Sequence, residues 1–380
     1  MTPAFDPLAE LWDVFERAVA CDTAVRAGEH RVAADDPRLA AFAETVAAPM
    51  LEAIGATTRT DSAGNLVATV GPISGTETLF VAYPATHHGN DTDDPLRARR
   101  EVVAGATEWI GQGANEGKAP FAALIEALRR SASDGVALSG RVIVAVSTEG
   151  SSSNESSTVL FDELERLPAA AVLLVGTENR LALGHRGRAD VRVITHGQAM
   201  HSSAAAGLAN PIATICAAER AVHGVAASWS AQREGRSITP YRLTCGPIAP
   251  HTMPAVCELV LDCRFLAGDD VAEVCAQLVT AIADRSVSVD IGPVMLPAAV
   301  EPDNPLVERF RAAAERAGTA LDTFTPTWTF DAGAAHRRGV PAVLFGPSTE
   351  RLAAITSTDA VAVDTLSRAA DILTALIHLA

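Results

Sequence analysis

A change in the order of predicted elements near residue 187 constrains the fold of this chain more than any other sequence feature. Residues 188–196 alternate, with Val191 and Val193 on one face and Arg192 on the other, which is typical of a strand with one buried side. The patterns that follow predict a helix, two strands, a helix and a strand, at residues 209–226, 238–246, 256–265, 269–283 and 286–292. This β-α-β-β-α-β order predicts a ferredoxin-like α+β domain.

The residues on either side of this segment have another pattern, in which apolar strands alternate with amphipathic helices. Residues 142–146 and 172–175 are continuous apolar runs of the kind buried on both faces of a sheet. Further strands are expected at residues 65–70, 78–83 and 342–345, and helices at residues 7–27, 37–54, 120–130, from 305, and 364–379. Residues 84–118 are expected to be irregular.

The alternation implies an α/β fold, a mostly parallel sheet with helices on both faces. Such sheets place their sites in the loops at the carboxyl ends of the strands. We therefore expect a catalytic-type α/β domain made of residues 1–186 and 296–380. Residues 187–295 are expected to form the inserted α+β domain.

Composition excludes several classes of partner. The net charge of −16 and the absence of a Lys/Arg run argue against nucleic acid and anionic membrane surfaces, which require clustered positive charge. A small molecule is the expected partner. The first residues lack a basic stretch followed by an apolar run, so we expect a cytoplasmic location. The six cysteines show no Cys-x-x-Cys spacing and are expected to be free, buried thiols.

Three adjoining motifs carry a family resemblance: the Gly-His-Arg-Gly sequence at residues 184–187, the strand at 188–196, and Ala-Met-His-Ser-Ser at 199–203. Together they resemble the start of the lid and dimerisation domain of zinc amidohydrolases such as acetylornithine deacetylase, succinyl-diaminopimelate desuccinylase, aminoacylase and glutamate carboxypeptidase. The resemblance extends from about Leu39 to Leu379. It implies the zinc-peptidase fold, with residues 187–295 as the lid domain and a homodimer formed through it.

In that family, two zinc ions bridged by a carboxylate and a water polarise the scissile carbonyl and supply a hydroxide. The residues that match the five zinc ligands are mostly different here: Pro84, Glu116, Gly150, Thr177 and Ile355, of which only Glu116 retains a carboxylate. Proline and glycine offer no side-chain donor to a metal, so the inherited two-zinc geometry cannot form from this set. We therefore expect the fold without its dinuclear centre, and no cofactor.

Two alternatives keep a metal. One is a relocated site formed by the polar residues that follow the first motif, His87, His88, Asp91, Asp93 and Asp94, although an Asp/Gly-rich stretch is usually a solvated loop. If no metal binds there, His87 and His88 are candidates for substrate binding. The other alternative shifts the fourth motif by one residue, which would place Glu178 at the ligand position.

Three acid/base groups are retained at positions that the resemblance assigns to catalysis. Glu149 takes the place of the general base, Glu116 keeps a carboxylate beside it, and His201 takes the place of the lid histidine that stabilises the oxyanion in the partner subunit's site. The alternatives are a solvent-facing carboxylate for Glu149 and, for His201, a turn that caps the helix predicted from residue 209.

Three more residues match family motifs and are candidates for substrate binding; of these motifs, the asparagine of Asn-x-x-Pro faces the substrate in the family. His251 occupies the place of asparagine in Asn-x-x-Pro, Arg264 ends an Asp-x-Arg motif, and Thr329 lies in a Thr-Ser-Asp-like turn. Arg264 is suited to bind a substrate carboxylate in a bidentate manner, although an ion pair with Asp262 within the fold is an equal alternative.

Three functions follow from these residues. The first is a metal-independent enzyme acting on a small metabolite with an amide, acyl or carboxylate group, in which Glu149 and His201 assist cyclisation, elimination or acyl transfer. The second is a metal-dependent hydrolase of N-acyl amino acids or short peptides with an altered metal site. The third is a non-catalytic binding protein on the same fold.

Overall fold

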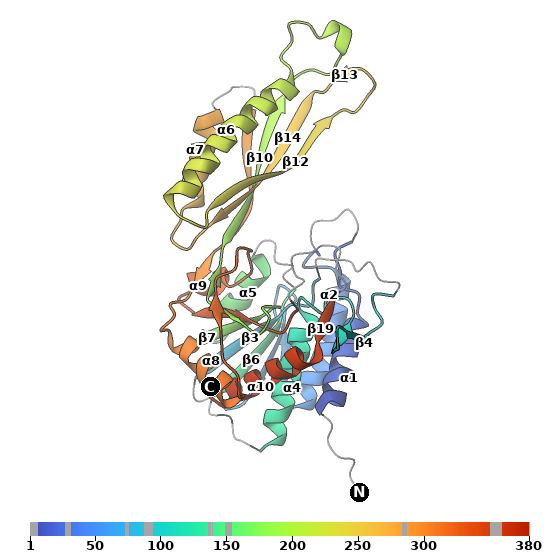
Figure 1. Cartoon of the computed structure of the whole chain (residues 1–380), viewed down its shortest axis with the longest axis vertical. Helices are drawn as coiled ribbons and strands as arrows, with labels where there is room; N and C mark the ends of the chain where they lie inside the picture. Colours follow the sequence, from blue (N-terminus) through green and yellow to red (C-terminus); the bar gives the residue numbers. More distant parts are fainter. Residues whose placement is uncertain are drawn as a thin grey trace. The chain divides into compact units, whose positions relative to one another are not determined.

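The computed structural model describes residues 7–26, 32–72, 76–86, 94–135, 138, 140–148, 154–282, 287–349 and 359–379. The chain forms two compact units (Figure 1). Unit 1 comprises Met1–Gly184, Ala299–Pro326 and Asp331–Ala380, and unit 2 comprises His185–Ala298 and Thr327–Phe330. None of the helices in these ranges is long and apolar enough to span a bilayer.

Unit 1 is built on an eight-stranded mixed sheet with the strand order β1-β2-β6-β3-β7-β18-β8-β17. The strands are β1 (Thr57–Thr60), β2 (Leu66–Val70), β3 (Glu77–Ala82), β6 (Arg141–Val146), β7 (Ala170–Leu174), β8 (Leu181–Ala182), β17 (Thr323–Phe324) and β18 (Ala342–Phe345). Its central strands β6, β3, β7 and β18 are parallel, and β2 joins β6 antiparallel. The predicted α/β class with a mostly parallel sheet is confirmed.

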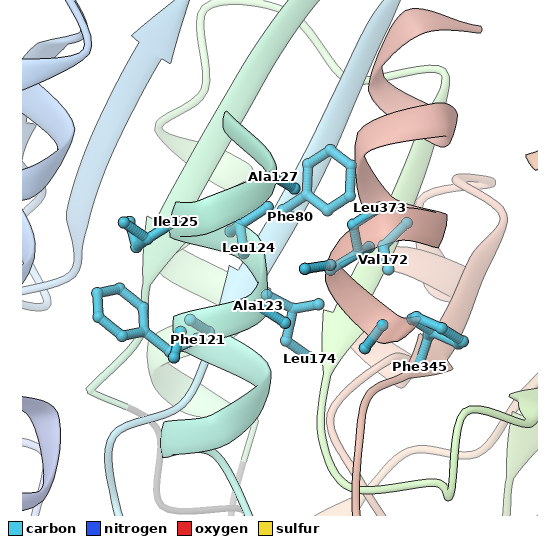
Figure 2. Packing of buried hydrophobic residues seen from close by; sticks show 14 of the residues in the cluster. Phe80, Phe121, Ala123, Leu124, Ile125, Ala127, Val172, Leu174, Phe345 and Leu373 are labelled. Atoms are coloured by element: carbon cyan, nitrogen blue, oxygen red, sulfur yellow. The ribbon is translucent and has the colours of Figure 1, made fainter. Parts of the chain in front are cut away.

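The central strands are apolar along their whole length because both faces of the sheet are covered. Neighbouring residues Leu79 and Phe80 of β3 point to opposite faces, and both are completely buried. Figure 2 shows Phe80, Val172 and Leu174 from the sheet packed with residues of two helices. These helices are α4 (Lys118–Ser133) and α10 (Val363–His378).

The remaining helices of unit 1 are α1 (Pro7–Val19), α2 (Pro37–Phe42), α3 (Ala48–Ala53), α5 (Glu155–Asp162), α8 (Pro305–Arg316) and α9 (Gly333–Arg337). The helix predicted over 37–54 is present, but a π-helical turn (Ala43–Ala47) separates α2 from α3. Pro49 lies at the start of α3 and has no N–H to donate to the preceding turn, which explains the local widening. The first helix ends at Val19, earlier than predicted.

The prediction that residues 84–118 are irregular is wrong for their second half. Strands β4 (Arg99–Val103) and β5 (Ala106–Ile110) form a hairpin, and β19 (Ala360–Ala362) extends it to a three-stranded sheet. Ala104 and Gly105 both have positive φ, of 51° and 89°, as a two-residue type I′ turn requires. Residues 87–93 lie outside the described part of the chain.

Unit 2 is a four-stranded antiparallel sheet with the order β12-β14-β10-β15. Its strands are β10 (Gly187–His196), β12 (Ser237–Gly246), β14 (Val256–Phe265) and β15 (Val287–Met295). Helices α6 (Pro211–Gln232) and α7 (Val271–Ile282) pack together over one face, as Figure 1 shows, and share one apolar core with the strands. The split β-α-β-β-α-β order is therefore present.

The prediction that all six cysteines are free is wrong for two of them, because Cys245 and Cys257 form a disulfide. They are opposite residues in the pairing of β12 with β14. Spacing along the chain gave no indication of this bond, which depends on the register of two strands. Cys21 and Cys216 are free thiols.

A substitution at Gly187 tests the packing of unit 2. A Cβ added at Gly187 would lie 2.1 Å from Cε2 of the buried Phe265 ring, so we expect Gly187→Ala to lower the free energy of unfolding by about 1–3 kcal/mol. Gly224→Ala is the matched control, because its Cβ would meet no atom within 4 Å and alanine favours the helix at this exposed position of α6. Urea unfolding followed by circular dichroism measures both. An unchanged midpoint for Gly187→Ala would contradict the packing described here.

Candidate functional site

Four loops of unit 1 meet beyond the carboxyl ends of the parallel strands. The residues that follow β3, β5, β7 and β18 touch through their backbones: Gly176 N donates to Glu116 O at 3.0 Å, and Thr177 N donates to Gly346 O at 3.0 Å. Gly117 lies so close to Tyr83 O that an added Cβ would be 1.9 Å from it. This is the edge at which α/β sheets carry their sites.

The loop that carries Glu116 is held by one buried carboxylate. Asp359 accepts hydrogen bonds from Asn115 N at 2.6 Å and from Gly113 N, one on each carboxylate oxygen. Its own carbonyl accepts from Gly111 N at 3.0 Å. The side chain of Asn115 then accepts from Thr349 N at 2.7 Å. The position of Glu116 is therefore fixed by backbone contacts on both sides of it.

Two buried ionisable groups flank this loop. Lys118 is completely buried, its Nζ donates to Cys21 O at 2.6 Å, and burial lowers the pKa of its ammonium to about 8. Burial, and then the nearby Glu116 carboxylate, raise the pKa of Asp359 to about 7. Near neutral pH the Asp359 carboxyl is thus divided between its protonated and ionised forms.

Two hydrogen-bond networks hold the segments on either side of Glu149, which itself lies outside the described residues. On the preceding side, Asn65 Oδ1 accepts from Thr148 N at 2.9 Å and from Ser156 Oγ at 2.7 Å. On the following side, Asn154 Nδ2 donates to the buried Asp331.

Asp331 also accepts from Tyr83 Oη at 3.0 Å, which anchors the end of β3. The sequence patterns did not single out Asp359, Asp331, Tyr83 or Asn65 for these roles. No local signal in the sequence indicates that the partners of Asp331 and Asp359 lie more than 170 residues away.

The described donors do not fit the family's dinuclear zinc centre. Pro84 has no donor atom, and Thr177 Oγ1 is already engaged with Arg180 O at 2.7 Å and Gly346 N at 3.1 Å. Within the described ranges no group of three or more His, Cys, Asp and Glu side chains could hold a metal. Glu178 is exposed in a left-handed conformation with φ of 58°.

His87, His88, Asp91, Asp93, Gly150 and Ile355 lie outside the described residues. The relocated metal site and the substrate-binding role of the two histidines therefore stay untested. The expected absence of a cofactor likewise stays a prediction.

In unit 2, the structure brings His201 and His251 together, with ring centroids 5.9 Å apart. Strands β11 (Met200–His201) and β13 (Thr252–Met253) pair, and Ser202 N donates to His251 O at 2.7 Å. Both histidines are exposed. His201 caps only the short 3₁₀ turn Ser202–Ala204, because the N-cap of α6 is Asn210.

The ring orientation of His201 is fixed by its Nδ1 atom. Ser203 N–H donates to Nδ1 at 3.3 Å, and Ser203 Oγ lies 2.8 Å from the same atom. Because Nδ1 accepts, the neutral ring carries its proton on Nε2. Nε2–H is then available as a hydrogen-bond donor.

Arg264 and Thr329, both predicted to contact substrate, are also neighbours in unit 2. Arg264 Nη1 donates to Thr329 Oγ1 at 2.6 Å. Its Nε and Nη2 donate to the two oxygens of Asp262 at 2.5 and 2.8 Å. The alternative of an ion pair within the fold is thus present, and it orients the guanidinium in a bidentate manner.

The pKa of Asp359 predicts a change of stability with pH. The pKa of this carboxyl is 3.8 when free and about 7 in the fold, so the folded state binds the extra proton between these values. The contribution of Asp359 to the free energy of unfolding is then fully present below about pH 4. It is lost as the pH rises to 7, by an amount on the order of 4 kcal/mol. Asp359→Asn should remove this fall, because the amide does not titrate.

Urea unfolding at a series of pH values measures the effect. Asp371→Asn is the control, since that aspartate is exposed on the surface of α10 and pairs with Arg130. A wild-type and an Asp359→Asn protein with parallel pH profiles would show that Asp359 is ionised normally in the fold.

Comparison with known proteins agrees with this architecture. Residues 183–290 match the peptidase dimerisation domain of the M20 family. A protein of Aeropyrum pernix named as a LysW-lysine/LysW-ornithine hydrolase is 33% identical over 146 residues, which are 38% of this chain and 38% of that protein. The match thus spans well under half the length of this relative.

Solved structures match over almost the whole chain. An M20 family metallo-carboxypeptidase from Sulfolobus solfataricus has a TM-score of 0.77 at 14% identity, covering 97% of this chain and 98% of that one. A tripeptidase from Staphylococcus aureus has 0.76 at 14%, covering 98% of both chains, and human carnosine dipeptidase 1 has 0.74 at 15%, covering 98% and 96%. Residues 183–290 are therefore a peptidase dimerisation domain, and the fold of the chain is similar to that of M20 peptidase structures.

Proposed function

We propose that this chain is an M20-fold enzyme that acts on a small metabolite with an amide, acyl or carboxylate group through acid/base catalysis, without the family's two-zinc centre. The observation that carries the proposal is a contrast between the residues at the zinc-ligand positions, which are replaced, and the loop that carries Glu116, which is still held in place. Pro84 and Thr177 replace metal ligands, and Thr177 uses its hydroxyl within the fold. The loop that carries Glu116 is nevertheless held in place by Asp359, which accepts hydrogen bonds from Gly113 N and Asn115 N.

Glu149 is the proposed general base, and Glu116 the carboxylate beside it. A proton shared near Glu116 and Asp359 is supported by the raised pKa of Asp359, at about 7. A group with a pKa near the working pH can both give and take a proton efficiently. These carboxyls suit a reaction in which a proton is removed at one atom and returned at another.

His201 is the proposed oxyanion donor, acting, as in the resembled family, on the site of the partner subunit. The contact of Ser203 N–H with Nδ1 supports this role, since it leaves the Nε2 proton free to donate. A neutral donor aimed at the developing negative charge stabilises a tetrahedral or enolate-like transition state. His251 and the Arg264–Thr329 pair are the proposed substrate-binding groups.

This set of groups favours cyclisation, elimination or acyl transfer over amide hydrolysis. A water with no metal beside it keeps a pKa of about 15.7, so a carboxylate alone activates it poorly. Transfer within one substrate, or to an amine nucleophile, avoids that difficulty.

The comparisons favour a second candidate, a metal-dependent hydrolase of N-acyl amino acids or short peptides. The relative that matches part of the chain is named as a hydrolase of LysW-bound lysine or ornithine, and the similar structures include peptidases. In this candidate the metal would need ligands among residues outside the described ranges, such as His87 and His88.

Zinc content separates the two candidates. We expect protein purified without chelator and without a metal-binding tag to contain close to no zinc by elemental analysis, because Pro84 and Thr177 cannot act as ligands. One or two zinc ions per chain, with activity lost to a chelator, would overturn the proposal in favour of the hydrolase.

Turnover should depend on Glu149. With N-acyl amino acids and dipeptides as probes, and product formation followed by mass spectrometry, Glu149→Gln should slow the reaction by about a hundredfold or more. Glu165→Gln is the control, since Glu165 is 81% exposed and lies beside Arg141 at the opposite ends of the strands. Equal rates for wild type and Glu149→Gln would refute the mechanism, and binding without any product would indicate the non-catalytic protein.

We further propose a homodimer formed through edge strand β12 of unit 2. The match to the dimerisation domain supports a dimer, and among the described strands β12 pairs with β14 alone. Its outer residues Tyr241 and Leu243 are 50% and 54% exposed. An unpaired apolar edge of this kind is suited to pairing with a second copy.

Leu243→Lys should therefore produce monomers, because it places a charge where apolar contact is expected. Sedimentation velocity gives the mass. Ile291→Lys on β15, the opposite edge of the same sheet, is the matched control and should remain dimeric. Dimeric Leu243→Lys, or a monomeric wild type, would exclude this interface.

A further inference from the structure

We propose that the Cys245–Cys257 disulfide is a clasp that positions His201 beside His251 and that responds to the thiol redox state. The geometric part of this inference concerns unit 2 alone. Its catalytic consequence rests on the role proposed above for His201, and the experiment separates the two.

The disulfide lies at the base of a chain excursion, residues 247–255, in which the chain leaves the sheet and returns to it. Cys245 and Cys257 are opposite residues near the end of the β12–β14 pairing, and only Gly246 and Val256 pair beyond them. Ala255 N donates to Gly246 O at 2.8 Å, and residues 247–255 leave and re-enter the sheet at this point. The sulfur bond therefore closes the base of the excursion covalently.

This excursion carries the partner of His201. Its residues 252 and 253 form β13, in which Thr252 pairs with His201 and Met253 with Met200. His251, just before β13, accepts a hydrogen bond from Ser202 N at 2.7 Å. We use the name histidine arm for residues 199–203 together with 247–255.

The histidine arm has few buried residues and few strand pairs to hold it in place. Only Met253 and Pro254 are buried among residues 247–255, and residues 201–203 are all exposed. A ladder of two residue pairs is too short to be stable by itself. The juxtaposition of the two imidazoles therefore depends on how firmly the excursion is fixed at its root.

Reduction of the disulfide would remove the covalent link at the base of the excursion, while strands β12 and β14 stay paired through their hydrogen bonds. Cys245 is half-buried on the open edge strand, whereas Cys257 is completely buried, so a dithiol reductant would attack the sulfur of Cys245. The attack forms a mixed disulfide and releases the Cys257 thiolate, which takes up a proton. The second thiol of the reductant then displaces the Cys245 sulfur, which is protonated in turn, and the reductant leaves as its own disulfide. Two electrons and two protons reach the protein.

The first measurement is a thiol count in denaturant, with and without earlier treatment with dithiothreitol. We expect the reduced wild-type chain to show two more reactive thiols than the untreated chain. The same count with and without the reductant would overturn the inference, because no disulfide would be present.

The second measurement is the NMR spectrum of protein with isotopically labelled histidine, with the two signals assigned from His201→Asn and His251→Asn. On treatment with dithiothreitol the His201 and His251 signals should shift or broaden. In a uniformly ¹⁵N-labelled sample the Met253 amide should exchange about tenfold faster. Cys245→Ser should show the spectrum of the reduced protein without any reductant.

Cys216→Ser is the matched control, since Cys216 is an exposed free thiol on α6 and its loss leaves the disulfide intact. It should respond to dithiothreitol as the wild type does. Unchanged imidazole signals after two thiols have appeared would overturn the clasp. A clear response of the histidines with unaltered product formation would support the clasp and overturn the proposed role of His201.

Discussion

The close approach of loop backbones at the carboxyl ends of the central strands is the constraint on which the candidate site depends. Glycine is required where Gly117 meets Tyr83 O, because any side chain would overlap the carbonyl. The same approach leaves backbone N–H groups that need acceptors, and Asp359 supplies both of its oxygens to Gly113 and Asn115. One carboxylate therefore satisfies the loop that presents Glu116 and connects it to a segment near the end of the chain.

Burial of ionisable groups in this arrangement costs free energy, which explains why the pKa values of Asp359 and Lys118 are shifted. Burying Asp359 and Lys118 in one small region disfavours the charge on each, so their pKa values move toward neutrality from opposite sides. Structural ion pairs produce the same effect, so the position of Asp359 and Lys118 matters as much as their pKa values. Their position among the four loops, beside the retained carboxylate of Glu116, is what makes a proton-transfer role physically reasonable.

The sequence predicted those features that are local or periodic. Alternation over 188–196 identified β10, and the apolar runs identified β6 and β7, because one short window contains the whole signal. The β4–β5 hairpin was missed, since its strands gain their third partner, β19, from residues 360–362. The Cys245–Cys257 bond and the contacts of Asp359 and Asp331 also require a register or a partner that no window contains. For the site, motif positions named Glu116, His201 and Arg264, but only the fold gave the pairs His201–His251 and Arg264–Thr329.

The two units differ in how they hold their polar groups, and this difference bears on function. In unit 1, Glu116 is flanked by residues that are buried and bonded through the backbone, so its position can change little without opening the core. In unit 2, His201 and His251 lie on exposed segments that a short ladder joins, and one disulfide closes the base of the segment that carries His251. The loop that carries Glu116 is therefore the more stable of these two segments. A change of conditions such as reduction of the disulfide acts most readily on the less stable segment, which is the histidine arm.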